Sequence, residues 1–161
     1  MIACPNLLVG NFRSASHLAW MYDIFCRTGI ALPFPIIADR SGEIARKYGM
    51  IANDISKTET VRNVYIIDEE GIIRVILIYP LNVGRWIPEI IRTVEALQIA
   101  DCADTSTPAN WRLGEPVIIK APKTYPQLQE RIVENEQGND AFSWYLTFKE
   151  LEKKYYVRIR T

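Results

Sequence analysis

The chain is poor in the residues that build metal centres and disulfide frameworks. It has 1 histidine and 3 cysteines (Cys4, Cys26 and Cys102), which are widely spaced and include no Cys-x-x-Cys pair. A thiolate–imidazole zinc site needs several such ligands at close spacing, and a disulfide framework needs an even number of cysteines. A hydrolase triad is likewise not indicated, because the single histidine has no clear serine partner. We therefore predict no metal site and no cofactor.

The sequence also lacks a net charge and a long apolar run. Its 19 lysine and arginine residues balance 19 aspartate and glutamate residues, so no general attraction to nucleic acid or anionic membranes is expected. No apolar run reaches the ~18 residues of a membrane span, and the first residues, MIACPNLLVGNFR, do not have the pattern of a signal peptide. We expect a soluble cytoplasmic protein, and any anion site in it must be local.

Up to residue 100, the pattern predicts alternating strands and helices. Apolar runs predict strands at 6–10 and 31–39, and helical spacing predicts helices at 17–29 and 41–49. The first helix has an apolar face of Leu18, Met21, Tyr22 and Phe25, and Ser41 is a possible cap of the second helix.

The stretch TVRNVYIIDEEGIIRVILIYP, residues 60–80, predicts a hairpin of two well-buried strands with a short glycine-containing turn. A helix follows, with apolar residues at 87, 90, 91, 94 and 97 forming the stripe of a helix packed on a sheet. The whole pattern is that of an α/β layered domain in which parallel strands give way to an antiparallel pair.

Beyond residue 100 the composition changes. Four prolines between 108 and 126 exclude a long regular element there, although 117–120 could be an edge strand and 125–136 a short helix. The tail is rich in aromatic residues, which must be buried on this chain or on a second subunit. They are Phe142, Trp144, Tyr145, Phe148, Tyr155 and Tyr156.

Arg62 is the main candidate for a functional residue because arginine is hardly ever buried in a strand without a partner. In one interpretation its guanidinium pairs with a structural carboxylate, for which Asp39 and Asp68 are available. In the other it is a fixed donor for a thiolate, a peroxide or a carboxylate. Arg85 is predicted at a strand-to-helix junction, where a helix N-terminus also favours anions, although it could equally be a solvent-exposed residue.

The cysteines are weaker candidates for chemistry. Cys26 is predicted to be a small packed side chain in a helix, and Cys102 to lie in a loop after Asp101. None of the three has an evident neighbour that would lower its thiol pKa, which is what a nucleophilic thiolate requires.

The hairpin stretch TVRNVYIIDEEGIIRVILIYPLNVGR resembles the corresponding part of peroxiredoxins, and most of all the one-cysteine type with a long C-terminal extension. The segments SHLAW, GIALPFPIIADRSGEIARKYGMI, VEALQIAD and TPANW agree in the same order. The resemblance covers nearly the whole chain from about Leu7, except for its last residues.

The resemblance implies a thioredoxin-like α/β fold, incomplete at the N-terminus, with a core at 1–100 and an extended C-terminal arm at 101–161 that packs in a homodimer. It implies thiol-dependent reduction of hydrogen peroxide and organic hydroperoxides, with an external thiol as reductant. It also implies that Arg62 matches the active-site arginine that holds the thiolate and the peroxide, and that Arg85 matches a second arginine near the same pocket.

The sequence departs from the family at the nucleophile. The family's Pro-x-x-x-Thr/Ser-x-x-Cys motif fits no residue here, so we expect that this chain lacks the peroxidatic cysteine and, with it, a central strand beside the one that carries Arg62. Whether the chain is an enzyme therefore stays open. The alternative is a non-catalytic, truncated subunit or interaction protein, and a redox role for Cys4 or Cys26 is a third hypothesis.

Overall fold

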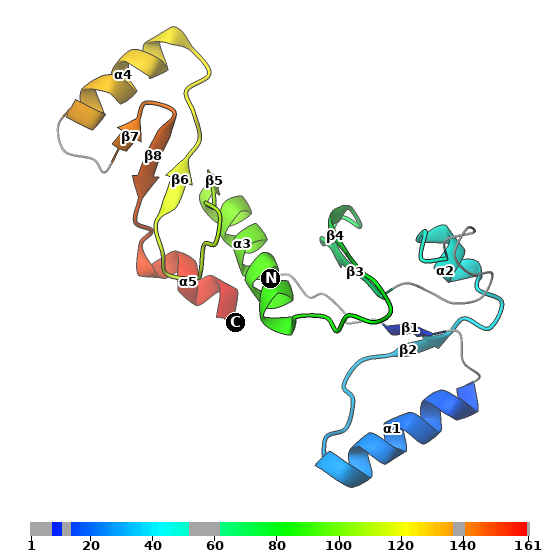
Figure 1. The fold of residues 1–161 in the computed structure, drawn as a ribbon. Coiled ribbons are helices and arrows are strands. Elements are labelled where there is room, and N and C mark those ends of the chain that lie inside the picture. The colour runs from blue at the N-terminus through cyan, green and yellow to red at the C-terminus, as the bar shows by residue number, and fades with distance from the viewer. Residues whose placement is uncertain (1–7, 11–13, 52–61, 137–140, 161) are drawn as a thin grey trace. The chain divides into compact units, whose positions relative to one another are not determined.

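The computed structural model describes residues 8–10, 14–51, 62–136 and 141–160, which form two compact units divided between Arg85 and Trp86 (Figure 1). The N-terminal unit contains β1 (Leu8–Gly10), α1 (Ser14–Thr28), β2 (Ile36–Ala38), α2 (Glu43–Lys47), β3 (Arg62–Ile67) and β4 (Ile73–Tyr79). The C-terminal unit contains α3 (Ile87–Ala103), β5 (Thr105–Ser106), β6 (Val117–Ile119), α4 (Tyr125–Glu136), β7 (Ala141–Ser143), β8 (Leu146–Lys149) and α5 (Lys153–Arg160). This order confirms the predicted alternation of strands and helices.

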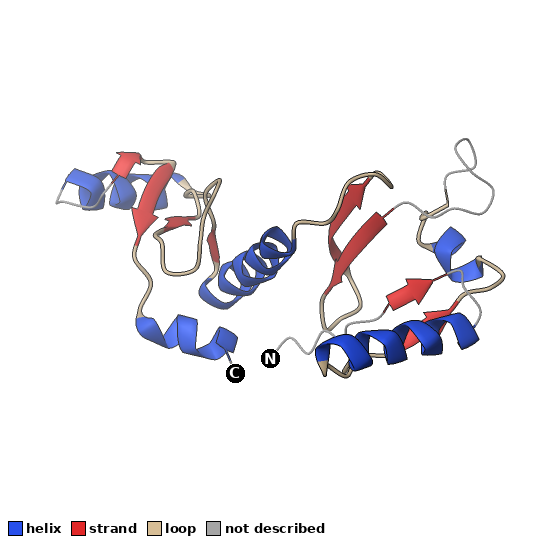
Figure 2. Ribbon diagram, turned by 60° about the horizontal axis from the view of Figure 1, so that its bottom comes forward, coloured by secondary structure: helices blue, strands red, loops and turns tan. Residues whose placement is uncertain are grey.

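The strands described in the N-terminal unit form two separate two-stranded sheets (Figure 2). β1 and β2 pair in parallel, and β3 and β4 form the predicted antiparallel hairpin, in which Arg62 lies opposite Tyr79. The turn of the hairpin places Gly71 at φ 80°, a conformation that glycine adopts without steric cost, and its N–H donates to the carbonyl of Asp68. Parallel strands thus give way to an antiparallel pair, as the sequence predicts.

The prediction of two well-buried strands is wrong for β4. Ile76 and Ile78 are 47% and 67% exposed, whereas Ile66 on β3 is buried. Exposed and half-buried residues alternate along β4 from Val75 to Tyr79, so one face of the strand is uncovered by the described residues and the other is partly covered.

The predicted apolar face of α1 is also largely uncovered. Met21 is half-buried, but Leu18, Tyr22 and Phe25 are between 51% and 70% exposed. The half-buried positions are His17, Met21 and Ile24, which follow helical spacing on the neighbouring side of the helix. The helix ends as predicted, since the N–H of Gly29 donates to the carbonyl of Phe25 and Gly29 has a φ of 71°.

The start of α2 is stabilised by Asp39 and not by Ser41, the cap that the sequence suggested. The Asp39 side chain is buried, and its Oδ2 accepts a hydrogen bond of 2.7 Å from the N–H of Ala45 in the first turn. Its carbonyl also accepts from the N–H of Gly42. Ser41 instead uses its backbone carbonyl to accept from the Arg46 guanidinium.

The C-terminal unit has a four-stranded antiparallel sheet and its own hydrophobic core. The strand order is β5-β6-β8-β7, so β6 lies inside the sheet and the prediction of an edge strand at 117–120 is wrong. The reason is that β8, in the aromatic tail, supplies the second neighbour of β6. The core consists of Ala96, Ile99, Trp111 and Val117, with Leu113, Leu151, Tyr155 and Tyr156 packed against it.

The aromatic tail is therefore only partly covered by its own chain. Tyr155 and Tyr156 of α5 pack on the core, whereas Trp144 and Tyr145, between β7 and β8, are 44% and 54% exposed. The rings of Trp144 and Tyr145 pack edge to face, with centroids 5.4 Å apart. The helix at 125–136 is where the sequence predicts it.

The buried face of α3 differs from the predicted stripe. Ala96 and Ile99 are buried, whereas Ile87 and Ile91 are more than half exposed, because α3 contacts α5 and β5 through its other side.

No described helix combines the length and the apolar character that crossing a membrane requires. In the structure α3 groups with the C-terminal unit. The predicted division of the protein into a core at 1–100 and an arm at 101–161 stays a prediction.

Candidate functional site

Arg62 is the first residue of β3, and its side chain is exposed, so the expectation of an arginine buried inside a strand is wrong, because the strand begins at this residue. Its Nη1 lies 3.5 Å from the carbonyl oxygen of Val83, which is the long limit of a hydrogen bond. Val83 belongs to a turn after β4, in which its N–H donates to the carbonyl of Pro80 at 3.0 Å. The guanidinium is thus directed toward this turn, but only one of its five donors is used there.

The two carboxylates that could have paired with Arg62 have other partners. The Asp39 carboxylate caps α2, as described above. Oδ1 of Asp68 accepts from the N–H groups of Glu70 and Ile72, and its Oδ2 lies 3.4 Å from Nη1 of Arg74. Among the described residues no ion pair joins Arg62 to Asp39 or Asp68, so these two carboxylates do not support the interpretation of Arg62 as their ion-pair partner.

Arg85 lies in the irregular segment between β4 and α3, two residues after the carbonyl that Arg62 contacts. It is exposed, and α3 begins at Ile87, so the predicted position at a strand-to-helix junction is confirmed. The contact between Arg62 and Val83 therefore brings the start of β3 to the same segment that carries Arg85.

The cysteines do not gather at this site. Cys26 is an exposed free thiol on α1, so the prediction of a packed side chain is wrong, because the side of α1 that carries it is uncovered. Cys102 is half-buried and lies in the last turn of α3 and not in a loop, since the helix continues to Ala103. Cys4 lies outside the described residues.

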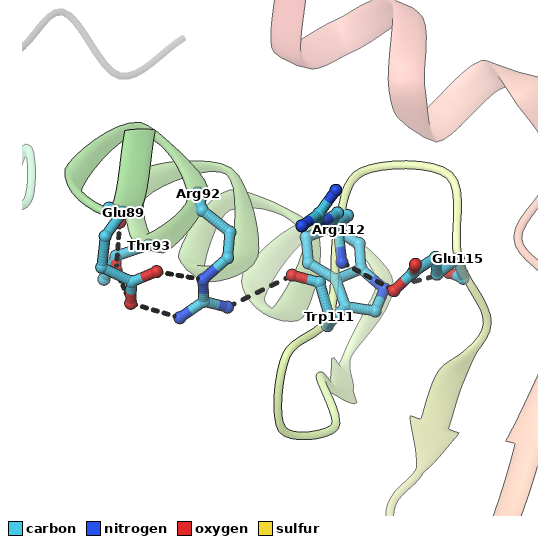
Figure 3. Close-up of polar contacts among 6 residues, drawn as sticks. All are labelled: Glu89, Arg92, Thr93, Trp111, Arg112 and Glu115. Atoms are coloured by element: carbon cyan, nitrogen blue, oxygen red, sulfur yellow. Dashed lines mark hydrogen bonds and ion pairs between the residues drawn. The ribbon is translucent and has the colours of Figure 1, made fainter. Parts of the chain in front are cut away.

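A network of polar contacts that the sequence did not single out lies in the C-terminal unit (Figure 3). The Arg92 guanidinium donates to both carboxylate oxygens of Glu89, at 2.6 and 2.7 Å, and to the carbonyl of Trp111 at 3.3 Å. The indole N–H of Trp111 donates to the carbonyl of Glu115. The spacing of Glu89 and Arg92, three residues apart on a helix, is the one signal by which the sequence could have indicated the ion pair.

This network fixes the loop that contains Trp111 against α3. The hydrogen bond from Arg92 lowers the pKa of the Glu89 carboxyl group, and the same bond raises the pKa of Arg92. Because the two charges neutralise each other, the network offers no free group for an anion. We interpret it as structural.

A groove of about 320 Å³ lies beside Arg92, between α3 and the segment from Thr107 to Asn110. Much of its lining is apolar and includes Ala96 and Leu97. Within the described ranges, no three or more histidine, cysteine, aspartate or glutamate side chains gather so that they could hold a metal ion. Arg62 and Arg85 remain the candidates for binding an anion.

Known protein families match parts of both units. The AhpC/TSA family matches residues 8–76, and the C-terminal domain of 1-Cys peroxiredoxin matches residues 96–135. Peroxiredoxin 2 of Caldanaerobacter subterraneus is 48% identical over 136 residues, and a peroxiredoxin of Nanoarchaeum equitans is 41% identical over 149 residues, which cover 85% of this chain and 67% of that protein. The chain belongs to the peroxiredoxin family. It is of the 1-Cys type, since the family of 1-Cys C-terminal domains matches it.

Solved peroxiredoxin structures agree with this conclusion. A yeast mitochondrial 1-Cys peroxiredoxin superposes with a TM-score of 0.75 at 30% identity, covering 90% of this chain and 70% of that one. Peroxiredoxin 6 of Arenicola marina gives a TM-score of 0.74 at 27% identity, with coverage of 91% and 70%. The expected thioredoxin-like fold of this peroxiredoxin is confirmed.

This peroxiredoxin chain spans less than two thirds of the length of several relatives. The matched residues cover 84% of this chain but 61% of the Caldanaerobacter protein and 64% of the peroxiredoxin of Aquifex aeolicus.

Proposed function

We propose that this chain supplies the arginine site of a thiol-dependent peroxidase that reduces hydrogen peroxide and organic hydroperoxides. Its support is the exposed Arg62 guanidinium, since Asp39 and Asp68, the carboxylates considered as its partners, contact other groups. Arg85 lies on the segment that Arg62 contacts and adds a second positive charge. Arginine suits this role because its planar fork of donors binds an anion in a fixed geometry.

In the proposed reaction, a cysteine thiolate attacks the terminal oxygen of the peroxide. The O–O bond breaks, the remaining oxygen leaves as an alcohol or water after taking up a proton, and the sulfur becomes a sulfenic acid. An external thiol then condenses with the sulfenic acid, releasing water, and a second thiol resolves the mixed disulfide. Arg62 would stabilise both the thiolate and the charge that develops on the departing oxygen.

We propose that the nucleophile is none of Cys4, Cys26 and Cys102. Cys26 lies on α1 and Cys102 in the last turn of α3, so neither belongs to the segments of Arg62, Val83 and Arg85 that form the proposed anion site. The purified chain should therefore consume no peroxide with dithiothreitol as reductant, and mass spectrometry after a peroxide pulse should find slow, unselective oxidation of its thiols. Rapid turnover with a sulfenic acid on one cysteine would contradict this assignment and identify the nucleophile.

The role of Arg62 can be measured once a nucleophile is supplied. We expect the part of the Caldanaerobacter relative outside its match to this chain to supply one, since the match covers 61% of that protein. We expect peroxide turnover by the mixture, and a decrease of about 100-fold in kcat/KM for Arg62→Met, the usual cost of removing a donor to a developing charge. Arg74→Met is the matched control, because Arg74 lies in the same hairpin but pairs with Asp68. Equal losses for both variants would show that Arg62 acts only through the fold.

A non-catalytic subunit is the second candidate function. The observation that favours it is the exposure of large apolar side chains on α1 and β4, which are typical of an interaction surface. Tight association with the supplied polypeptide but no turnover would favour this function.

We also propose a cytoplasmic homo-oligomer in which residues 101–161 form an arm on a second subunit. The reduced thiols of Cys26 and Cys102 fit a reducing compartment, and the exposed ring pair of Trp144 and Tyr145 fits an intersubunit contact. Light scattering of the chain and of Trp144→Ser would test the arm, and cell fractionation would test the compartment.

A further inference from the structure

The Arg62 side chain is held only weakly by its own contacts. Among the described residues, its guanidinium makes one long hydrogen bond, 3.5 Å from Nη1 to the Val83 carbonyl, and the side chain is exposed. Arginine loses much rotamer freedom when it is fixed, and one bond at the limit of length does little to offset that loss. The direction of the side chain therefore depends on how firmly the backbone at the start of β3 is held.

Packing holds only part of β3. Successive side chains of a strand point to opposite faces, so Asn63 and Tyr65 share a face that Arg62 does not. On this face Ile78 lies opposite Asn63, and Ile76 lies opposite Tyr65. Both isoleucines are exposed, whereas Asn63 and Tyr65 are half-buried. The contacts that hold this face are therefore those of Asn63 and Tyr65 and not those of β4.

Two hydrogen bonds tie this face of β3 to the end of α2. The Tyr65 hydroxyl donates to the Tyr48 carbonyl, and the two rings pack edge to face with centroids 5.1 Å apart. Nδ2 of Asn63 donates to the Tyr65 hydroxyl oxygen at 2.9 Å. Tyr48 follows the last residue of α2, where carbonyl groups have no partner within the helix. The Tyr65 hydroxyl thus satisfies a carbonyl that the helix leaves open.

The same bonds fix the orientation of the Asn63 amide. A tyrosine hydroxyl has one proton, and since Tyr65 donates it to Tyr48, its oxygen can only accept from Asn63. Nδ2 must therefore face Tyr65, and Oδ1 of Asn63 is buried without a hydrogen-bond partner among the described residues. A buried acceptor without a partner is unfavourable. The bond to Tyr65 is thus what keeps the Asn63 side chain in this orientation.

We propose that Tyr65 and Asn63 are positioning residues for Arg62. Their hydrogen bonds fix the start of β3 against Tyr48, and since Asn63 and Arg62 are consecutive, a fixed Asn63 sets the direction in which Arg62 leaves the opposite face. The inference rests on the proposed function, in which the guanidinium must lie at a fixed place beside the reacting atoms.

The first test measures Arg62 itself in the full chain and needs no turnover. Tyr65→Phe removes only the hydroxyl. In nitrogen–proton correlation spectra, the Nε–H resonance of Arg62, identified by its loss in Arg62→Met, should shift in Tyr65→Phe, and its order parameter should decrease. Asn63→Ala should change both in the same direction. Tyr22→Phe is the matched control, because it removes a hydroxyl from a 70% exposed ring on α1, and it should change neither.

The second test measures turnover by the mixture of this chain with the polypeptide from the Caldanaerobacter relative. Tyr65→Phe should lower kcat/KM at least about tenfold, since misplacing a catalytic group by about 1 Å can cost about 100-fold. In the Arg62→Met background the same substitution should cost no further turnover, because it acts only through Arg62. A structural role would lower turnover in both backgrounds.

Several outcomes would overturn the proposal: an unchanged Arg62 resonance in Tyr65→Phe, an equal change in Tyr22→Phe, or an equal loss of turnover in both backgrounds. If circular dichroism shows that Tyr65→Phe does not fold, Asn63→Ala decides, since it leaves the bond between Tyr65 and Tyr48 in place. An unchanged Arg62 resonance in that variant would reject the positioning role. With no turnover by the wild-type mixture the proposed function fails, and the Arg62 resonance alone decides whether Tyr65 and Asn63 hold this side chain.

Discussion

Glu89 and Arg92 form a doubly hydrogen-bonded ion pair on the first turns of α3, and Arg92 also donates to the Trp111 carbonyl. A carboxylate near a helix N-terminus is favourable because it interacts with the positive end of the helix dipole. The pair is partly exposed, so its contribution to stability is small and is screened by salt. The main effect of the ion pair is to hold the Arg92 guanidinium in the orientation that contacts the loop containing Trp111.

The stability of the chain should therefore depend on the charge of Glu89. Its pKa is lowered in the folded state from the ordinary 4.5, so the stabilisation is present above that value and disappears as the pH falls through the lower folded-state pKa. Glu89→Gln should be less stable than the wild type at pH 7, and the difference should vanish in acid. Urea unfolding followed by circular dichroism at several pH values measures it. A difference that is constant with pH would assign the effect to packing.

At the scale of the element, α1 shows that helical spacing in a sequence does not determine which of the residues are buried. Tyr22 is 70% exposed and Phe25 is 51% exposed, although both belong to the apolar face that the spacing predicts. Met21, at the margin of the same face, is half-buried. Period and propensity therefore place the helix correctly but do not decide which side of it has a partner.

Substitutions on α1 should reflect this difference. Tyr22→Lys should change the free energy of unfolding by less than about 0.5 kcal/mol, the usual range for an exposed site, and should reduce aggregation by breaking the apolar face. Met21→Lys, one residue away, should cost about 1–2 kcal/mol because it forces a charge into a half-buried position. Urea unfolding and light scattering measure the two effects. If Tyr22→Lys proves as destabilising as Met21→Lys, the exposed face is covered in solution.

The same limit explains what the sequence could and could not predict elsewhere. The strands and helices up to α3 were predictable because their periods are local. The exposure of Arg62 was not, because the apolar run around it predicts a residue inside a buried strand, whereas Arg62 is the first residue of β3. The interior position of β6 was not predictable, because its neighbour β8 lies 27 or more residues further along the sequence. β8 is also short and lies in the aromatic-rich tail, where the sequence does not indicate a strand. The contact of Arg62 with Val83 likewise joins residues that are 21 positions apart.

At the scale of the whole molecule, the two units differ in how much core they possess. The largest fully buried side chains, Trp111, Ile99, Val117 and Thr147, all belong to the C-terminal unit. The N-terminal unit has smaller buried sites, at Ala45, Ile51 and Ile66, together with open strand edges. The C-terminal unit therefore has the features of a domain that folds independently.

Residues 86–161 expressed alone should unfold cooperatively in urea, with a midpoint close to that of the more stable transition of the full chain. Residues 1–85 alone should show a broad, weakly cooperative transition, because the described residues of this unit include few buried apolar side chains. Circular dichroism and amide dispersion in NMR spectra distinguish these outcomes. Loss of cooperative unfolding in the isolated 86–161 fragment would mean that its core depends on the N-terminal unit.

The burial of Trp111 also gives the protein a built-in optical probe. Of its 4 tryptophans, Trp20, Trp86 and Trp144 are 46%, 67% and 44% exposed, whereas Trp111 is fully buried in the core of the C-terminal unit. A collisional quencher such as iodide reaches only exposed indoles, so the emission that survives quenching comes mainly from Trp111. That residual fluorescence follows the folding of the C-terminal unit in the unlabelled, full-length chain.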